Sequence, residues 1–238
     1  MDGIINIYKP RGITSYDVIR IIKKEFKFKD KIGHGGTLDP IGEGVLIICI
    51  GNATKLLNQF LNFDKEYIAE VLLGLKTDTD DIDGNIIEKR EVGNINEQDI
   101  INVVKSFEGE IEQIPPIVSA IKHKGVPLYT YYRKGVKIQP SPRKVFIKKI
   151  EIIKISLPYL ELKVLCSKGT YIRSLCRDIG EKLGCGGTQN KLIRTKVGMF
   201  KIEDSVKIED LRKYGIEKYL IYPSEISKIL YGYLNGKS

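Results

Sequence analysis

The sequence has no apolar segment long enough to cross a membrane. Its longest unbroken apolar run, residues 45–50, is far shorter than the roughly 20 residues that a spanning helix needs. The first ten residues, MDGIINIYKP, lack both the basic and the apolar region of a secretory signal. These absences predict a cytoplasmic protein with no membrane partner.

Cysteine is scarce, and its spacing excludes the common metal-binding patterns. The four cysteines form no CxxC pair, and each lies in or beside an apolar stretch: Cys49, Cys166, Cys176 and Cys185. Free cysteine is often a buried, small apolar residue. We therefore expect buried reduced thiols, with no metal ion and no disulfide framework.

A glycine-rich segment, GHGGTLDPIGEGVL, places five glycines around Asp39 but fits no standard phosphate-binding loop. It lacks both the Lys-Ser or Lys-Thr pair of a Walker loop and the GxGxxG spacing of a dinucleotide site. Asp39 and Glu43 are not expected to be the paired acids of a glycosidase, because the proline and glycines around them disfavour a helix. A turn that only reverses the chain remains an alternative reading of this segment.

The acidic segment TDTDDIDGNIIEKR also fails as a metal site. With Gly84 at the sixth position of a calcium loop, the twelfth position falls on Arg90, where a carboxylate is required. A polar turn between two strands is expected instead.

Acidic residues are outnumbered by basic ones, 30 to 39, which leaves a net charge of +9. Such an excess favours a polyanionic partner, either nucleic acid or an anionic membrane surface. Residues 113–150 contain nine Lys or Arg and no acid, together with His123 and three tyrosines, Tyr129, Tyr131 and Tyr132. Basic groups among aromatic residues and prolines indicate a mobile arm that holds phosphates and stacks on unpaired bases. A solvated basic loop is the alternative.

Apolar spacing predicts an α+β fold, with a mixed, mainly antiparallel sheet and flanking helices. Apolar residues recur at helical spacing in three segments: residues 15–26, the segment after Asn96 and the segment before Gly184. Thr14 and Asp17 form a capping box at the start of the first. Strands are expected at 44–51, 67–75 and 159–167, and two short helices after residue 205. Arg173 and Arg177 fall outside the apolar stripe of the helix before Gly184, so they face something other than the core.

Several segments together resemble the TruB family of pseudouridine synthases. They occur in order between about residues 3 and 200: KPRGITS, GHGGTLDP, KEYIAEVLLGLKTDTDDIDG, IPPIVSAIKHKG, YRKG and KGTYIRSLCRDIG. The family includes a bacterial tRNA enzyme and an archaeal and eukaryotic enzyme guided by H/ACA RNA. The resemblance implies cofactor-free isomerisation of uridine to pseudouridine, in the bacterial branch at position 55 of the tRNA T-loop.

The resemblance also assigns roles to single residues. Asp39 is the catalytic carboxylate, acting either as a nucleophile or as a base that gives a glycal, and the glycines let the backbone approach a flipped-out nucleotide. Tyr67 stacks on the base, Arg173 pairs with Asp39, and His34 helps to keep the target nucleotide out of its stack. Further substrate-binding residues are expected at Lys9, Lys55, Tyr129, Arg133, Lys134, Arg143 and Arg194.

The sequence departs from the family at three places. Gly35 replaces a usual Thr or Ser and is expected to loosen the loop, and Ile193 replaces an expected arginine in LIRT. Bacterial relatives commonly continue into an RNA-binding PUA domain, whereas residues 205–238 are predicted to be a short extension without one.

We therefore expect a catalytic domain at 1–204, with an RNA-clamping insertion at about 115–145. The expected partner is the T-arm of tRNA, bound by a monomer without an obligatory protein partner. A non-catalytic RNA binder or RNA-folding helper of the same fold is the rival reading.

Overall fold

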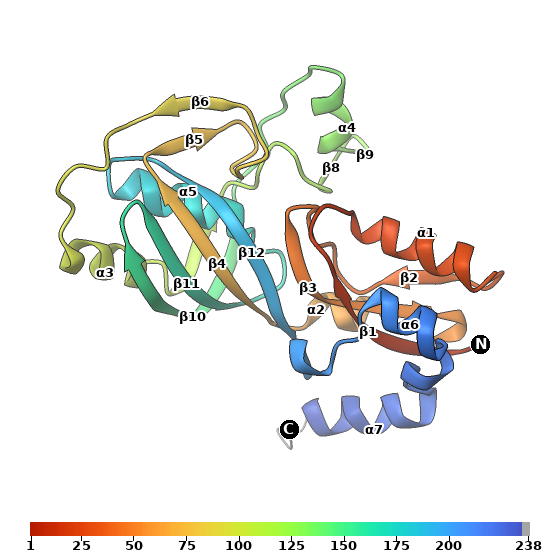
Figure 1. The fold of residues 1–238 in the computed structure, drawn as a ribbon. Helices are drawn as coiled ribbons and strands as arrows, with labels where there is room; N and C mark the ends of the chain where they lie inside the picture. Colours follow the sequence, from red (N-terminus) through yellow and green to blue (C-terminus); the bar gives the residue numbers. More distant parts are fainter. Residues whose placement is uncertain (235–238) are drawn as a thin grey trace. The chain divides into compact units, whose positions relative to one another are not determined.

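The computed structural model describes residues 1–234 and has the predicted α+β architecture (Figure 1). The chain forms two compact units, one from residues 1–67 and the described residues from 192 onward, the other from residues 68–191. Two strands, β4 (Lys65–Leu73) and β12 (Gly187–Val197), begin in one unit and end in the other.

The first unit is built on β1 (Gly3–Lys9) and β3 (Gly42–Ile50), which pair antiparallel along their length. The short strand β2 (Ile32–His34) also pairs antiparallel with β3, and β3 runs parallel to β12 over Leu192, Ile193 and Arg194. Helices α1 (Ser15–Glu25), α2 (Leu57–Asn62), α6 (Ile208–Tyr214) and α7 (Pro223–Leu234) surround these strands. The remaining short elements are η1 (Gly51–Leu56), β13 (Phe200–Lys201), η2 (Ile202–Asp204) and η3 (Glu217–Tyr219).

Strand β3 is apolar at successive positions because both of its faces are covered. Leu46, Ile48 and Ile50 contact one buried cluster, which includes residues of α1 and α6. Val45 and Ile47 contact a second cluster, which includes residues of α2 and α7. This double burial explains the continuous apolar run that the sequence shows at this position.

The second unit contains a sheet in the order β4-β11-β10-β7, in which β10 (Arg143–Ser156) pairs antiparallel with β11 (Tyr159–Cys166) and with β7 (Gly109–Gln113). Two hairpins lie outside this sheet, formed by β5 (Leu75–Thr77) with β6 (Ile86–Lys89) and by β8 (Lys122–His123) with β9 (Val126–Pro127). Its helices are α3 (Glu97–Lys105), α4 (Leu128–Arg133) and α5 (Ile172–Lys182).

Most of the local predictions are confirmed. Thr14 and Asp17 form the expected capping box, Asn96 caps α3, and the acidic turn joins β5 to β6. Cys49, Cys166, Cys176 and Cys185 are all buried thiols, as expected. No helix within residues 1–234 is both long and apolar enough to span a bilayer.

Candidate active site

Asp39 lies in the loop between β2 and β3, at a turn fixed by backbone hydrogen bonds in the first unit. The Gly42 amide donates to the Asp39 carbonyl at 3.0 Å, and the Gly12 amide donates to the Pro40 carbonyl at 2.8 Å. The Asp39 side chain is half-buried. The turn therefore holds this carboxylate in a defined place, with part of its surface open to a ligand.

Ser15 joins the start of α1 to the same loop. Its buried hydroxyl donates to the Leu38 carbonyl at 2.9 Å and accepts from the Leu38 amide at 2.8 Å. Both backbone groups of the residue before Asp39 are therefore bound to one side chain. A shift of α1 would move the carboxylate with it.

Arg194 holds the loop from the other side. Only 1% of the surface of this residue is exposed. Its guanidinium donates to the carbonyls of Val45 at 2.7 Å, Thr37 at 3.1 Å and Gly36 at 3.1 Å. These bonds make Arg194 a support for the loop that carries Asp39. Its expected contact with RNA stays a prediction.

Gly44 is needed because β3 passes very close to β12. Its φ is +104°, and a Cβ atom there would lie 2.3 Å from the carbonyl oxygen of Arg194. Gly42 is also closely packed, since a Cβ atom would lie 2.8 Å from Leu38 Cδ1. Packing within the unit thus accounts for these two glycines, and the approach of a nucleotide to the backbone stays a prediction.

Lys9 is fully buried beside this loop. Its Nζ donates to the carbonyls of Pro10 at 2.9 Å and Ile13 at 2.7 Å. Burial and the positive charge of Arg194 lower the pKa of Lys9 to about 8, although the charges of Asp39 and Glu43 act in the opposite direction. The structure thus places Lys9 as a buried cation near the carboxylates of the loop.

Two neighbouring groups also have shifted pKa values. Burial, followed by the charge of Arg194, lowers the pKa of His34, against the effect of its hydrogen bond with Gly36. His34 is therefore held neutral near pH 7. Burial and the hydrogen bond to Glu43 raise the pKa of Tyr8 to about 12, so its hydroxyl remains protonated.

The remaining predicted residues of this unit differ in exposure. Tyr67 is buried, with 8% of its surface exposed, on the same face of β4 as Lys65. Lys55 is exposed on η1. Hydrogen bonds from Asn52 lower the pKa of Asp2, and the positive charge of Lys55 lowers it further.

In the second unit, Arg173 projects from α5 into a buried polar environment. It is 3% exposed, and its guanidinium donates to the carbonyls of Thr79 at 3.0 Å and Val118 at 2.9 Å. Its Nη1 also lies 3.4 Å from the Asp81 carboxylate. Arg173 faces loops and not the apolar core, as its position outside the apolar stripe of α5 predicts. Its pairing with Asp39 stays a prediction.

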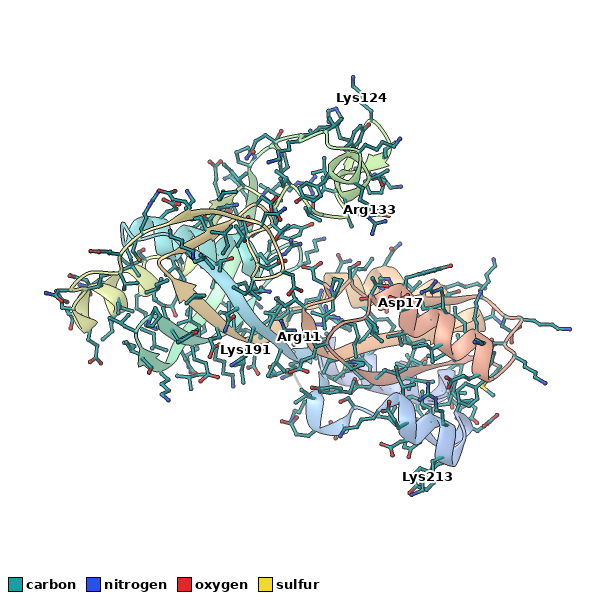
Figure 2. The ribbon with its side chains drawn as sticks, turned by 45° about the horizontal axis from the view of Figure 1, so that its top comes forward. Arg11, Asp17, Lys124, Arg133, Lys191 and Lys213 are labelled. Carbon is teal, nitrogen blue, oxygen red and sulfur yellow. The ribbon has the colours of Figure 1, made fainter. Side chains whose placement is uncertain are left out.

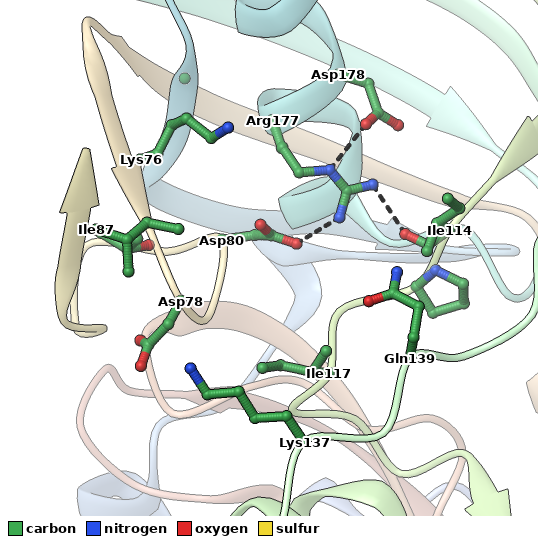
Figure 3. A pocket seen from close by; sticks show the side chains of 13 residues that line it. Lys76, Asp78, Asp80, Ile87, Ile114, Ile117, Lys137, Gln139, Arg177 and Asp178 are labelled. Atoms are coloured by element: carbon green, nitrogen blue, oxygen red, sulfur yellow. Dashed lines mark hydrogen bonds and ion pairs between the residues drawn. The ribbon is translucent and has the colours of Figure 1, made fainter. Parts of the chain in front are cut away.

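One helical turn later, Arg177 lines a pocket of about 390 Å³ (Figure 3). It pairs with Asp80 at 2.7 Å and Asp178 at 2.9 Å and donates to the Ile114 carbonyl at 2.9 Å. Burial raises the pKa of Asp80, although the charges of Arg177 and Arg173 oppose the shift. The arginines of α5 thus bind the segments around residues 80 and 114–118.

The predicted basic arm contains β8, β9 and α4, and Figure 2 labels Lys124 and Arg133 on it. Tyr132 donates from its hydroxyl to Asp78 at 2.7 Å, which fastens the arm to the turn between β5 and β6. Tyr131 donates to the carbonyl of His123 at 3.2 Å. These two tyrosines therefore have partners within the unit.

The expected RNA-binding side chains of the arm lie at its surface. Tyr129 is exposed, and the guanidinium of Arg133 lies 5.4 Å from the centre of its ring. Lys134 at the end of α4 and Arg143 at the start of β10 are also exposed. An aromatic face next to exposed cations can stack on a base and bind phosphate.

Comparison with known proteins identifies the family. A model for the N-terminal domain of TruB family pseudouridylate synthases matches residues 23–172, and one for the C-terminal domain of tRNA pseudouridylate synthase B matches residues 173–230. The chain belongs to the TruB family.

TruB-family relatives match most of this chain. The tRNA pseudouridine synthase B of Clostridium tetani is 52% identical over 94% of this chain and 77% of its own length. The enzyme of Clostridium kluyveri is 49% identical over 98% of this chain and 79% of its own length. The enzyme of Alkaliphilus oremlandii is 50% identical over 94% of this chain and 75% of its own length.

Two solved structures resemble this fold over about nine tenths of the chain. A protein from a crystal structure of a Cbf5-Nop10-Gar1 complex is 36% identical, with a TM-score of 0.71 over 91% of this chain. A protein from an H/ACA RNP bound to a substrate RNA containing 2'-deoxyuridine is 33% identical, with a TM-score of 0.67 over 89%. This chain spans 57% and 53% of the length of those two proteins.

Two of the three departures from the TruB family pattern, Gly35 and Ile193, lie in the first unit. The Gly35 amide donates to the Ile47 carbonyl at 2.8 Å, and a Cβ atom at Gly35 would lie 2.7 Å from Phe60 Cβ. The loop is therefore closely packed at Gly35 rather than loosened. Ile193 is half-buried in β12, opposite Glu43 of β3.

Two polar residues that hold predicted site residues or their loops, one in each unit, were not predicted. Asp81 accepts from Thr79 Oγ1 at 2.7 Å and from the Asp83 amide at 3.2 Å, besides lying against Arg173. The acidic segment was considered as a metal site and as a polar turn, so its value as a partner for arginine was missed. Ser15 was treated only as part of a helix start, and no local signal indicates its bonds to a residue 23 positions away.

Proposed function

We propose that this TruB-family chain isomerises uridine to pseudouridine in tRNA, at position 55 of the T-loop. The observation that carries the proposal is the half-buried carboxylate of Asp39 on a loop bound by Ser15, Gly12 and Arg194. The similarity to the three tRNA pseudouridine synthase B relatives supports tRNA as the substrate.

The reaction breaks the C1′–N1 glycosidic bond, rotates the detached uracil and joins C1′ to C5, from which a proton is lost. Asp39 either attacks the nucleoside as a nucleophile or removes a sugar proton to give a glycal. In both routes a positioned carboxylate next to a flipped-out nucleotide performs the decisive step. A loop held by backbone hydrogen bonds suits this chemistry, because little reorganisation is needed during the reaction.

The other assigned residues have supporting roles in this proposal. Tyr67 stacks on the target base, Arg173 pairs with Asp39 and orients it, and neutral His34 helps to keep the nucleotide out of its stack. Lys9 supports the pocket from its buried position. RNA is bound outside the pocket by several side chains: Lys55, Tyr129, Arg133, Lys134 and Arg143. Arg194 serves substrate binding from its buried position, through the loop that it holds.

Residues 1–204 carry catalysis in this proposal, and residues 205–238 form a short C-terminal extension. The insertion at about 115–145 clamps the T-arm. The enzyme acts in the cytoplasm as a monomer and needs no protein partner or cofactor. In contrast, one of the similar solved structures is a Cbf5-Nop10-Gar1 complex.

Tritium release tests the reaction directly. Wild type, Asp39→Asn and a transcript with cytidine at the target position are compared, using tRNA labelled at C5 of uridine. Release by wild type, absent with the variant enzyme and with the altered transcript, is the expected result. Retained tRNA binding by Asp39→Asn is the control for folding.

The rival function, a non-catalytic RNA binder or folding helper, makes the opposite prediction. Wild type would then bind tRNA without releasing tritium, and Asp39→Asn would leave every measured property unchanged. That result would overturn the catalytic assignment.

A further inference from the structure

A second basic surface lies in the first unit, far along the chain from the basic arm. Residues 20–31 form the end of α1 and the turn that follows it. This segment contains five lysines, all exposed: Lys23, Lys24, Lys27, Lys29 and Lys31. Five cations within nine residues generate a strong local positive potential.

The acidic residues of this segment are already paired with other groups. Glu25 accepts both hydrogen bonds of a bidentate pair from Arg212, at 2.6 and 2.8 Å. Asp30 accepts from the N-terminal amine at 3.0 Å. The lysine charges are therefore presented to solvent with little compensation from the two carboxylates beside them.

Helix α6 extends this surface. The pair between Glu25 and Arg212 joins α1 to α6, and apolar residues of both helices belong to the same buried cluster. Tyr214 at the end of α6 is 47% exposed, with Lys213 and Lys218 placed 4.8 and 4.3 Å from its ring centre. Figure 2 labels Lys213 at the surface of the unit. We call these seven lysines the α1–α6 lysine surface.

The position of this surface relative to Asp39 follows from α1 itself. The helix begins at Ser15, which is hydrogen-bonded to the residue before Asp39, and its 11 residues rise about 16 Å to its other end. Lys23 and Lys24, in the last turn of α1, thus lie roughly one helix length from the start of the helix beside the carboxylate. One ligand reaching both places must be an extended polyanion.

We propose that the α1–α6 lysine surface binds phosphates of the tRNA outside the T-arm while the target uridine lies at Asp39. This inference rests on the proposed function for the substrate class and for the place of the uridine. Lysine is a flexible point charge that suits phosphate contacts without reading bases, so the surface adds affinity and not sequence preference.

The test compares two variants that each remove four lysines from a protein of net charge +9. The surface variant carries Lys23→Gln, Lys24→Gln, Lys27→Gln and Lys29→Gln. The control variant carries four changes at exposed lysines of the second unit outside residues 113–150: Lys89→Gln, Lys105→Gln, Lys154→Gln and Lys182→Gln. Binding is measured from 50 to 300 mM NaCl with full-length tRNA and with an isolated T-arm hairpin.

The surface variant is expected to bind full-length tRNA at least tenfold more weakly than wild type at 100 mM NaCl. The slope of log affinity against log salt should fall in magnitude by about 2 to 4, since each lost phosphate contact contributes about 0.7 to 0.9. Binding to the hairpin and tritium release from it should match wild type, and the control variant should bind full-length tRNA like wild type.

Equal losses in both variants would overturn the proposal, because they would reflect net charge alone. An equal loss on tRNA and hairpin, or no loss on either, would also overturn it. If wild type released no tritium but the surface variant still lost tRNA affinity selectively, the proposed function would fail while the surface assignment held. Loss of binding to anionic lipid vesicles with unchanged tRNA affinity would instead indicate a membrane surface.

Discussion

At the residue scale, Asp81 is the partner that balances the charge of Arg173 in the second unit. The carboxylate is buried and lies 3.4 Å from Nη1 of a guanidinium that is itself buried. Asp81→Asn keeps the shape but leaves a buried cation without this charge, so the free energy of unfolding should fall by about 3 kcal/mol. Urea denaturation measures the change.

Asp83→Asn is the matched control for this prediction, because Asp83 lies two residues away and is exposed. Its unfolding free energy should stay within about 0.5 kcal/mol of wild type. Equal effects of the two substitutions would show that the charge of Asp81 contributes nothing specific.

Lys9 leads to a prediction on alkaline stability. Burial lowers its pKa from 10.5 to about 8, so between these pH values the unfolded chain binds more protons at this site than the folded chain. The contribution of Lys9 to the free energy of unfolding therefore rises with pH between about 8 and 10.5. Relative to Lys9→Met, wild type should gain up to about 3 kcal/mol of unfolding free energy across that window. Parallel curves for the two proteins in chemical denaturation would contradict the assignment.

At the scale of elements, the contact of β3 with β12 depends on Gly44. Gly44→Ala introduces a Cβ atom 2.3 Å from the Arg194 carbonyl, in addition to the strain of a positive φ. Gly93→Ala is the control, since Gly93 also has a positive φ, +63°, but has no neighbouring atom within 4 Å of the added carbon. The control should cost about 1 to 2 kcal/mol and Gly44→Ala clearly more, as measured by thermal unfolding.

A tyrosine hydroxyl joins the basic arm to the turn between β5 and β6 in the second unit. Tyr132→Phe removes the bond to Asp78, and trypsin should then cut faster after Lys124, Arg133 and Lys134, because the arm opens more often. Tyr131→Phe, which removes a bond only within the arm, should leave the cleavage rate closer to that of wild type. Mass spectrometry of timed digests locates the cuts. Identical digestion of all three proteins would contradict the role of Tyr132.

These elements also show which parts of the structure can be predicted from sequence. Helix caps such as Thr14 with Asp17 are local, so their residue types predict them directly. Strand β3 begins at Gly42, two residues before the predicted start, because Gly42 and Gly44 pair with a strand about 150 residues later. Family motifs led to Asp39, whereas the support from Ser15 and Arg194 depends on long-range packing that local patterns do not contain.

At the scale of the whole molecule, the net charge of +9 predicts strong salt dependence of tRNA binding. A protein that neutralises six or more phosphates should lose about 1,000-fold or more in affinity between 50 and 200 mM salt. Filter binding with wild-type protein and tRNA measures this slope. An affinity that stays flat over this range would mean that apolar or base contacts, and not phosphates, dominate binding.

The hydrogen bonds of Arg194 also have a consequence during synthesis of the chain. Its guanidinium completes the loop around Thr37, although the two residues are 157 positions apart. At 5 to 20 residues per second, Arg194 is made roughly 8 to 30 s after Thr37. Until then the loop lacks its support, so ribosome-bound chains that stop before β12 should be unable to form a working carboxylate site. Activity therefore begins only after β12 has been made.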